Sequence, residues 1–393
     1  MAGGSLAATT AIYCDGVRRI GNPCLTHGLS RSAATLPERK ADSVIQRQLK
    51  LKLTKRQERE LECWLYHLTS VWNWAIRKIE LDGKDGIYYS QQQFQNLLAG
   101  HSTKLDIPAH VLQATLRTAH QAWQRCFKKL SGRPRLKGRR NCLNSIPFQD
   151  PFRVWPNHRI SVLGIGRIRY HKQEIPRERI KGGRIVKRAS GWYLCLFIDA
   201  EPNAIPRVAS GQVGIDPGFK DLLSLSTGEK IEHPRELEAS AFRLAQAQRG
   251  NNRTLAARIQ EQIANQRKDR NHKLSRRLVS ENTLIAFSAD RHSAIARRFG
   301  KSVASSGDHQ LRSMLSYKCR AGGAIYVEPD SRNSTRTCSA CGALSGPTGL
   351  AGLKVRQWDC GACGAHHDRD TNAAMNALIA GAGLAHERLA RVA

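Results

Sequence analysis

Two pairs of cysteines place the strongest constraint on what this 393-residue chain can fold into. Cys338-Ser-Ala-Cys341 and Cys360-Gly-Ala-Cys363 are CxxC motifs, and eighteen residues separate them. Each motif presents two thiolates on one tight turn, and four thiolates at this spacing can close a tetrahedral zinc site. The pattern predicts one structural zinc ion in a ribbon over residues 338–363, where metal binding folds the segment and performs no chemistry.

The remaining cysteines favour zinc over a pair of disulfides. The chain has eleven cysteines, an odd number, and the other seven stand singly among apolar or basic neighbours, as free thiols of a reducing cytosol do. No stretch approaches the ~20 apolar residues of a membrane span, and residues 1–42 lack the apolar core of a secretory signal. We therefore expect a cytoplasmic protein without a membrane partner, with residues 1–43 as a flexible arm.

The charge balance indicates a polyanionic partner. The chain carries 63 Lys and Arg against 32 Asp and Glu, a formal net charge of +31. Such a surplus repels itself unless an anion is bound, and nucleic acid commonly matches it. Seven cations and no acid lie within residues 128–140, and we predict that this basic strap contacts phosphates rather than remaining a solvated loop. Its cations are Lys128, Lys129, Arg133, Arg135, Lys137, Arg139 and Arg140.

The apolar pattern of the first half predicts helices followed by a small barrel. Apolar residues alternate over 45–53, which is typical of a half-buried strand, and Thr54 then opens a helix. Helical spacing continues to residue 130, with tryptophans that we assign to helix packing rather than to base stacking. Short alternating runs broken by glycines over 152–198 predict an antiparallel barrel or sheet.

The second half is typical of an α/β layer with mixed strand pairing. We expect strands over 213–215, 222–225, 283–287 and 324–327, a long polar helical pair over 235–280, and an Ala-rich helix at the end.

Two carboxylates stand at element boundaries in this half. Asp216 follows an apolar strand and precedes a Pro-Gly turn, and Asp370 begins the last helix directly after the cysteine segment. Taken alone, each is an ordinary structural residue: a strand-end Asp, and a helix N-cap.

Several spaced motifs together resemble the transposon-encoded TnpB proteins, relatives of the type V CRISPR effectors. The resemblance covers roughly residues 44–385. The motifs are Trp72-Asn-Trp74, Gly132-Arg-Pro-Arg-Leu-Lys137, His272-Lys-Leu-Ser275, Ser334-Thr-Arg-Thr-Cys-Ser-Ala-Cys341 and Asp368-Arg-Asp-Thr-Asn-Ala-Ala374.

The resemblance implies an α+β multidomain fold and a domain order. It implies a helical recognition domain, a small wedge β-barrel, and a RuvC-like nuclease domain of the RNase H fold that carries the zinc ribbon as an insert. The expected boundaries are 44–53 and 141–210 for the barrel, 54–140 for the helices and strap, 211–337 and 364–385 for the nuclease, 338–363 for the ribbon as a target-nucleic-acid-binding insert, and 386–393 for a tail.

The resemblance also implies a function, that of an RNA-guided DNA endonuclease. Its partners would be a guide RNA (omega RNA) and double-stranded DNA carrying a short adjacent motif, in a bacterial cytoplasm and on the nucleoid when bound to DNA. Such a nuclease holds two Mg²⁺ ions between an Asp, a Glu and an Asp. Asp216 matches the first and Asp370 the last, with Asp368 a poorer match. The oligomeric state is left open.

The middle glutamate of the family is missing, because its position is Ser288. In one interpretation the carboxylate has moved to Glu328, at the end of the neighbouring strand, about 4.8 Å away. By alternation Glu328 faces away from Ile325 and Val327. Asp290 and Glu281 also flank the strand, but neither is well placed.

In the other interpretation the site is inactive. The protein would then bind guide RNA and open DNA as a transcriptional repressor without cutting. A DNA-joining transposase is a third class, and the sequence offers no Tyr nucleophile in a His-hydrophobic-His setting for it. His366 and His367 lie beside a complete Cys₄ set, and we interpret them as polar residues near nucleic acid.

Overall fold

The computed structural model describes most of the chain after residue 43. The described residues are 44–139, 141–148, 152–175, 180–199, 205, 210–218, 220–233, 235–289, 306–348, 352 and 354–390. The expected N-terminal arm, Arg140 of the strap and Asp290 lie outside this part of the chain.

Four helices follow the first strand, and the two longest are those that the apolar spacing predicts. Thr54 starts the longest of them through a capping box: its hydroxyl accepts from the Gln57 N–H, and the Gln57 side chain accepts from the Thr54 N–H. Trp64, Trp72 and Trp123 are buried in the hydrophobic core, which confirms their assignment to packing. The helices are α1 (Lys55–Lys84), α2 (Gln91–Asn96), α3 (Ser102–Leu105) and α4 (Ala109–Phe127).

The first sheet has seven strands, all paired antiparallel, in the order β2-β6-β7-β1-β5-β4-β3. Leu49 and Leu51 of its first strand are buried in one hydrophobic core together with residues of α1 and α4, so the helices and this sheet stabilise each other. Its strands are β1 (Val44–Lys52), β2 (Ser145–Phe148), β3 (Arg153–Trp155), β4 (Arg159–Val162), β5 (Gly166–Tyr170), β6 (Ile180–Arg188) and β7 (Gly191–Asp199).

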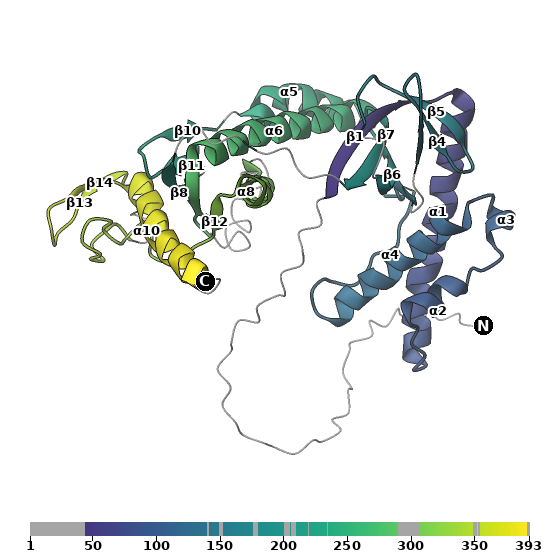
Figure 1. Ribbon diagram of the computed structural model, residues 1–393, viewed down its shortest axis with the longest axis horizontal. Coiled ribbons are helices and arrows are strands. Elements are labelled where there is room, and N and C mark those ends of the chain that lie inside the picture. The colour runs from purple at the N-terminus through teal and green to yellow at the C-terminus, as the bar shows by residue number, and fades with distance from the viewer. Residues whose placement is uncertain are drawn as a thin grey trace, which may run out of the picture. The chain divides into compact units, whose positions relative to one another are not determined.

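The second sheet has five strands in the order β10-β9-β8-β11-β12 (Figure 1). Its members are β8 (Gly211–Pro217), β9 (Asp221–Leu225), β10 (Lys230–Glu232), β11 (Asn282–Phe287) and β12 (Ile325–Val327). β8, β11 and β12 pair in parallel, while β9 pairs antiparallel with both of its neighbours, β8 and β10. This is the expected mixed pairing, and it brings the carboxyl ends of three strands to one edge.

Helices cover both faces of this sheet (Figure 1). Val213, Ile215 and Phe287 pack on one face against α6 (Arg253–Glu281) and α8 (Asp308–Gly322), and α5 (Glu236–Arg249) pairs with α6. Leu284, Ala286 and Val327 point to the other face, where α10 (Arg369–Ala390) lies. We call these the α8 side and the α10 side. A two-stranded ribbon of β13 (Gln357–Asp359) and β14 (His366–Asp368) leads into α10. Among the described helices, none has the length and apolar content to cross a bilayer.

Two glycines allow α10 to lie close to the sheet. A Cβ on Gly214 of β8 would stand 1.9 Å from the Ala374 carbonyl oxygen, and a Cβ on Gly381 would stand 2.4 Å from the Ala286 Cβ. Both distances are far inside van der Waals contact, so a side chain at either position would push the helix from the sheet.

We expect Gly381→Ala to destabilise the fold by about 1–3 kcal/mol, because the added methyl overpacks the contact between α10 and β11. Gly383→Ala is the matched control, since it lies on the same helix with nothing within 4 Å of the added Cβ. That change should be neutral or stabilise by up to about 1 kcal/mol through helix propensity. Urea denaturation of both variants checks this, and equal midpoints would contradict the close packing.

Candidate metal sites and the basic strap

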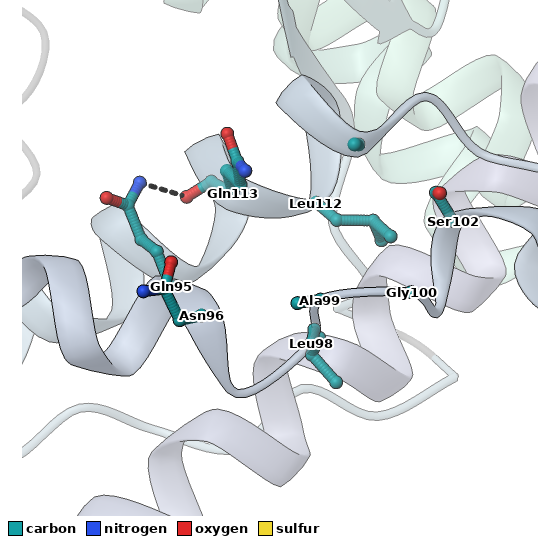
Figure 2. A pocket seen from close by; sticks show the side chains of 9 residues that line it. Gln95, Asn96, Leu98, Ala99, Gly100, Ser102, Leu112 and Gln113 are labelled. Carbon is teal, nitrogen blue, oxygen red and sulfur yellow. Dashed lines mark hydrogen bonds between the residues drawn. The ribbon is translucent and has the colours of Figure 1, made fainter.

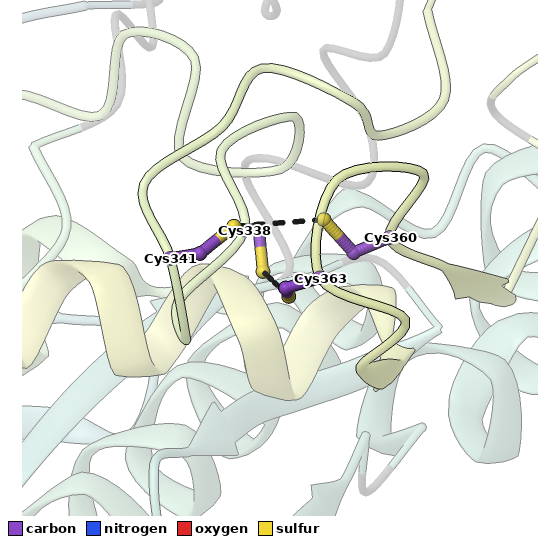
Figure 3. Close-up of side chains that lie close together, drawn as sticks. All are labelled: Cys338, Cys341, Cys360 and Cys363. Atoms are coloured by element: carbon purple, nitrogen blue, oxygen red, sulfur yellow. Dashed lines mark hydrogen bonds between the residues drawn. The ribbon is translucent and has the colours of Figure 1, made fainter.

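The four paired cysteines converge on one point (Figure 3). Their sulfur atoms all lie within 4.8 Å of one another, and the Cys338–Cys363 and Cys341–Cys360 sulfurs are 3.7 Å apart. A tetrahedron with zinc–sulfur bonds of about 2.3 Å has edges of about 3.8 Å. All four are free thiols. The geometry therefore fits a tetrahedral Cys₄ zinc site and not a pair of disulfides.

The two CxxC turns have the same backbone geometry. Gly342 donates its N–H to the Cys338 carbonyl and Gly364 donates to the Cys360 carbonyl, each at 2.8 Å. Both glycines have positive φ, +79° and +72°, a conformation that costs glycine little. The sequence places glycine there because the chain must turn back at that point to present both thiolates.

Polar neighbours surround the sulfurs. The Ser345 hydroxyl lies 3.0 Å from the Cys360 sulfur and lowers the pKa of that thiol to about 6. His367 Nε2 lies 3.0 Å from the Cys338 sulfur, and its ring packs on Trp358 at 4.7 Å. His367 is buried and lies against the Cys338 sulfur, whereas His366 bonds to Asp359. Nothing in the sequence pattern distinguishes the two histidines.

Two asparagines of α10 hold the first cysteine turn. Asn372, which is buried, accepts from the Ser339 N–H at 2.9 Å and donates to the Thr337 carbonyl at 2.8 Å. Asn376, one turn later, donates to the carbonyls of Ser334 and Thr337. The cysteine segment is thus fixed to the helix that begins with Asp370. Sequence reasoning missed this, although the four-residue spacing of the asparagines places them on one helix face.

Asp216 lies at the carboxyl end of β8 on the α10 side. Side chains alternate along a strand, and a Cβ on Gly214, two residues earlier, would point at α10. Ile215, between them, is buried on the α8 side. The sheet therefore directs Asp216 toward the surface on which α10 packs.

Asp370 and Asp368 stand at the start of α10. Asp370 forms an ion pair with Arg356 at 3.0 Å, and Asp368 forms one with Lys230 at 2.7 Å. Partial burial would raise the pKa of Asp368, but hydrogen bonds from Lys230 and from the Thr371 N–H outweigh it and lower the pKa. Asp368 caps the helix by accepting from the Thr371 N–H, while Asp370 lies in the first turn.

Ser288 follows β11 on the same side as Asp216. Phe287 pairs with Ile215 in register, and the Ser288 N–H donates to the Ile215 carbonyl at 2.9 Å, so Ser288 lies beside Asp216. Its side chain is buried, and its hydroxyl has no hydrogen-bond partner among the described residues. The position at which the resemblance implies a glutamate thus holds a neutral hydroxyl without a hydrogen-bond partner among the described residues.

Glu328 follows β12 and points to the α8 side. Val327 pairs with Ala286 in register and faces α10, so the next residue faces the other way, as alternation predicts. The Tyr326 hydroxyl donates to Glu328 at 2.6 Å, and Arg312 of α8 lies 3.5 Å from its other oxygen. Arg312 also donates to the Ser288 carbonyl at 2.8 Å.

The three candidate carboxylates therefore do not converge in this structure. Asp216 and Asp370 lie on the α10 side of the sheet, and Glu328 lies on the α8 side. In the described part of the chain, the four cysteines are the one group of three or more potential ligands whose atoms all lie within 4.8 Å. Carboxylate oxygens are the donors that Mg²⁺ prefers. Asp216 and Asp370 therefore offer suitable donors on the same side of the sheet, whereas Glu328 offers a suitable donor on the opposite side.

The basic strap is fixed to α1 through its backbone. The Trp72 indole donates to the Arg135 carbonyl at 3.2 Å. The Asn73 amide donates to the Lys137 carbonyl and accepts from the Lys137 N–H, both at 2.7 Å. Because the backbone is held, the cations project outward: Lys128, Lys129, Arg133, Arg135 and Arg139 are exposed, and Lys137 is half-buried. Arg133 pairs with Glu80.

A small pocket lies between α2 and α4 (Figure 2). Gln95 closes one side by donating to the Gln113 carbonyl at 2.9 Å, and Leu98, Ser102 and Leu112 line the rest. Its lining contains no acidic, basic, histidine or cysteine side chain, so it offers no acid, base or metal ligand.

Comparisons with known families match two parts of the chain. A model described as "Cas12f1-like, TNB domain" covers residues 309–377, which contain the cysteine site, Glu328 and Asp370. A model described as "Probable transposase" covers residues 200–288, which contain Asp216 and Ser288.

Two curated proteins are similar over most of their length. The chain is 33% identical over 290 residues to a Streptomyces pristinaespiralis protein named "Putative RNA-guided DNA endonuclease", covering 69% of this chain and 71% of that protein. It is 24% identical to "Putative RNA-guided DNA endonuclease InsQ" of Escherichia coli (strain K12), covering 70% of this chain and 75% of the relative. A Cas12f1 protein, solved by cryo-EM with sgRNA and target DNA, has a similar fold at a TM-score of 0.52 and 14% identity, with 82% of this chain and 83% of that chain covered.

Proposed function

Since this chain belongs to the TnpB family, we propose that it is an RNA-guided DNA endonuclease that cuts target DNA next to a short adjacent motif. Its partners are a guide RNA and double-stranded DNA, the partners that the names of its relatives and the net charge of +31 support. Base pairing carries the sequence specificity in such a system, so the protein needs mainly phosphate contacts. We assign part of these contacts to the basic strap.

The observation that carries this proposal is the placement of Asp216 and Asp370. They come from segments 154 residues apart in the sequence, and the close approach of Gly214 to Ala374 brings β8 and the start of α10 together on one side of the sheet. We propose that these two carboxylates hold Mg²⁺. When bound, a pair of such ions activates the attacking water and stabilises the leaving oxygen of a phosphodiester.

We propose Glu328 as the third carboxylate, and this requires a local rearrangement. A strand residue changes side only if the backbone turns over or shifts by one position. β12 is a three-residue edge strand, and Glu328 lies between its last residue and a bridge that pairs Asp330 with Ala289, so the change would also have to shift that bridge. Release of Glu328 from Tyr326 and Arg312 would be part of that change.

Ser288 favours a second function, which is RNA-guided DNA binding without cleavage. With a neutral hydroxyl beside Asp216 and with Glu328 held on the α8 side, only two carboxylates face α10 from the candidate set. A protein that keeps this arrangement would bind guide RNA and target DNA without cutting, and would act as a repressor.

Cleavage of guide-matched DNA by wild type and by Glu328→Gln separates these functions. We expect wild type to cut and Glu328→Gln to cut about 100-fold more slowly, because the variant removes one ligand charge, worth several kcal/mol in the transition state. Glu238→Gln is the control, since Glu238 is an exposed glutamate of α5, and it should cut like wild type.

Each other result has a distinct meaning. Equal rates for wild type and Glu328→Gln would exclude Glu328 as a ligand. A wild-type protein that binds guide-matched DNA but never cuts would establish the second function. A lack of affinity for the transcript that flanks its own gene would rule out both proposed functions.

A further inference from the structure

Asp370, the proposed metal ligand at the start of α10, is already paired with a cationic side chain of the protein. One guanidinium nitrogen of Arg356 lies 3.0 Å from its Oδ2, and the Asp370 side chain is only 22% exposed. A carboxylate oxygen in this position accepts the charge-assisted hydrogen bond through the same lone pairs that would bind a metal.

Arg356 belongs to the cysteine segment, residues 338–363, which we also call the zinc segment, and not to α10. Its carbonyl accepts from the Arg369 N–H at 2.8 Å, directly before the helix. The next residues form β13, which pairs with β14 and is followed directly by Cys360 of the proposed zinc site. The cysteine site closes this hairpin, so it also fixes the point from which the guanidinium extends.

We propose that Arg356 is a built-in competitor for the metal at Asp370, so that a divalent cation binds there only by displacing the guanidinium. The inference rests on the proposed role of Asp370. It adds a residue of the zinc segment to the metal site and gives that segment a second task, which is to lower the metal affinity of the site until the guanidinium is drawn away. A DNA phosphate is a chemically suitable acceptor for the released guanidinium.

The size of the effect follows from the exposure of the pair. The Arg356 side chain is 47% exposed, and a partly exposed ion pair is worth on the order of 1 kcal/mol. Removing the guanidinium also removes a positive charge that repels the incoming cation. Together these correspond to a change in metal affinity of about five- to tenfold.

Mn²⁺ binding to the full-length, zinc-loaded chain without nucleic acid tests the proposal, with free Mn²⁺ followed by electron paramagnetic resonance. Asp370→Asn identifies the binding that depends on this carboxylate. We expect Arg356→Gln to lower the Kd of that site about five- to tenfold, and Arg356→Lys, which keeps the charge, to stay within about twofold of wild type. Lys230→Gln is the matched control, because it frees Asp368 and leaves Asp370 paired.

An unchanged Kd in Arg356→Gln would overturn the proposal. An equal gain in Lys230→Gln would overturn it as well, because the effect would then be one of general charge and not of competition at Asp370. If Asp370→Asn binds Mn²⁺ as tightly as wild type, the metal role of Asp370 fails first, which distinguishes failure of the proposed function from failure of the competitor.

Discussion

We expect Asp216→Ala to cut guide-matched DNA at least about 1,000-fold more slowly than wild type while it binds guide RNA and target DNA equally well. The loss corresponds to about 4 kcal/mol of transition-state stabilisation, the scale on which a metal ligand acts. Binding should persist because Asp216 lies at a strand end in the sheet, while the cations that we assign to phosphates lie in the strap and elsewhere. Single-turnover cleavage and a binding titration at one fixed salt concentration measure the two quantities.

Two controls make this result specific to the carboxylate. Asp216→Asn keeps the size of the side chain and removes its charge, so it should lose cleavage to a similar extent without a packing change. Asp269→Ala removes an exposed carboxylate of α6 and should cut like wild type. Cleavage within about tenfold of wild type in both Asp216 variants would place the chemistry elsewhere in the protein.

Local patterns in the sequence are sufficient to predict the main helices and strands and the convergence of the four cysteines. The alternation of Leu49 and Leu51 predicts β1, the Thr54 cap predicts the start of α1, and the CxxC spacing predicts four sulfurs around one point. Each of these features is encoded within a few residues or in a repeated turn, so no knowledge of distant partners is needed.

The arrangement of the carboxylates could not be obtained in this way. Alternation correctly places Glu328 opposite Val327, but the side that holds Asp216 depends on how three strands align. The pairing of Ile215 with Phe287 and of Ala286 with Val327 decides it, and these pairs join segments far apart in the sequence. A shift of one residue in either pairing would have placed Asp216 and Glu328 on the same side of the sheet.

Contacts between distant side chains were also beyond the sequence. The apolar spacing predicts Trp72 as a packing residue, and it is buried, but its indole N–H also donates to the Arg135 carbonyl of the strap. The ion pair of Arg356 with Asp370 gave no signal, because one more arginine is unremarkable in a chain with 63 Lys and Arg. We propose functions for both contacts, and neither leaves a periodic pattern in the sequence.

Loss of one zinc ligand should have an effect as large as loss of Asp216, by a different route. We expect Cys360→Ser to lose zinc and to unfold the segment around 334–368, because binding of a structural zinc ion supplies about 10–16 kcal/mol to the folding of small domains. The hydrogen bonds of Asn372 and Asn376 to this segment would then break, and both Arg356 and the first turn of α10 would lose their fixed positions. DNA cleavage should fall below detection.

Zinc content and amide hydrogen exchange measure this directly. Wild type should contain one zinc ion per chain and protect the N–H groups of Ser339, Gly342 and Gly364, all of which are hydrogen-bonded. Cys360→Ser should lose the metal and this protection but keep the protection of β7, which belongs to the other sheet. Cys142→Ser, at an exposed cysteine outside the site, should match wild type in both. Full zinc content and unchanged exchange in Cys360→Ser would show that three sulfurs suffice, and that the segment folds without its complete metal site.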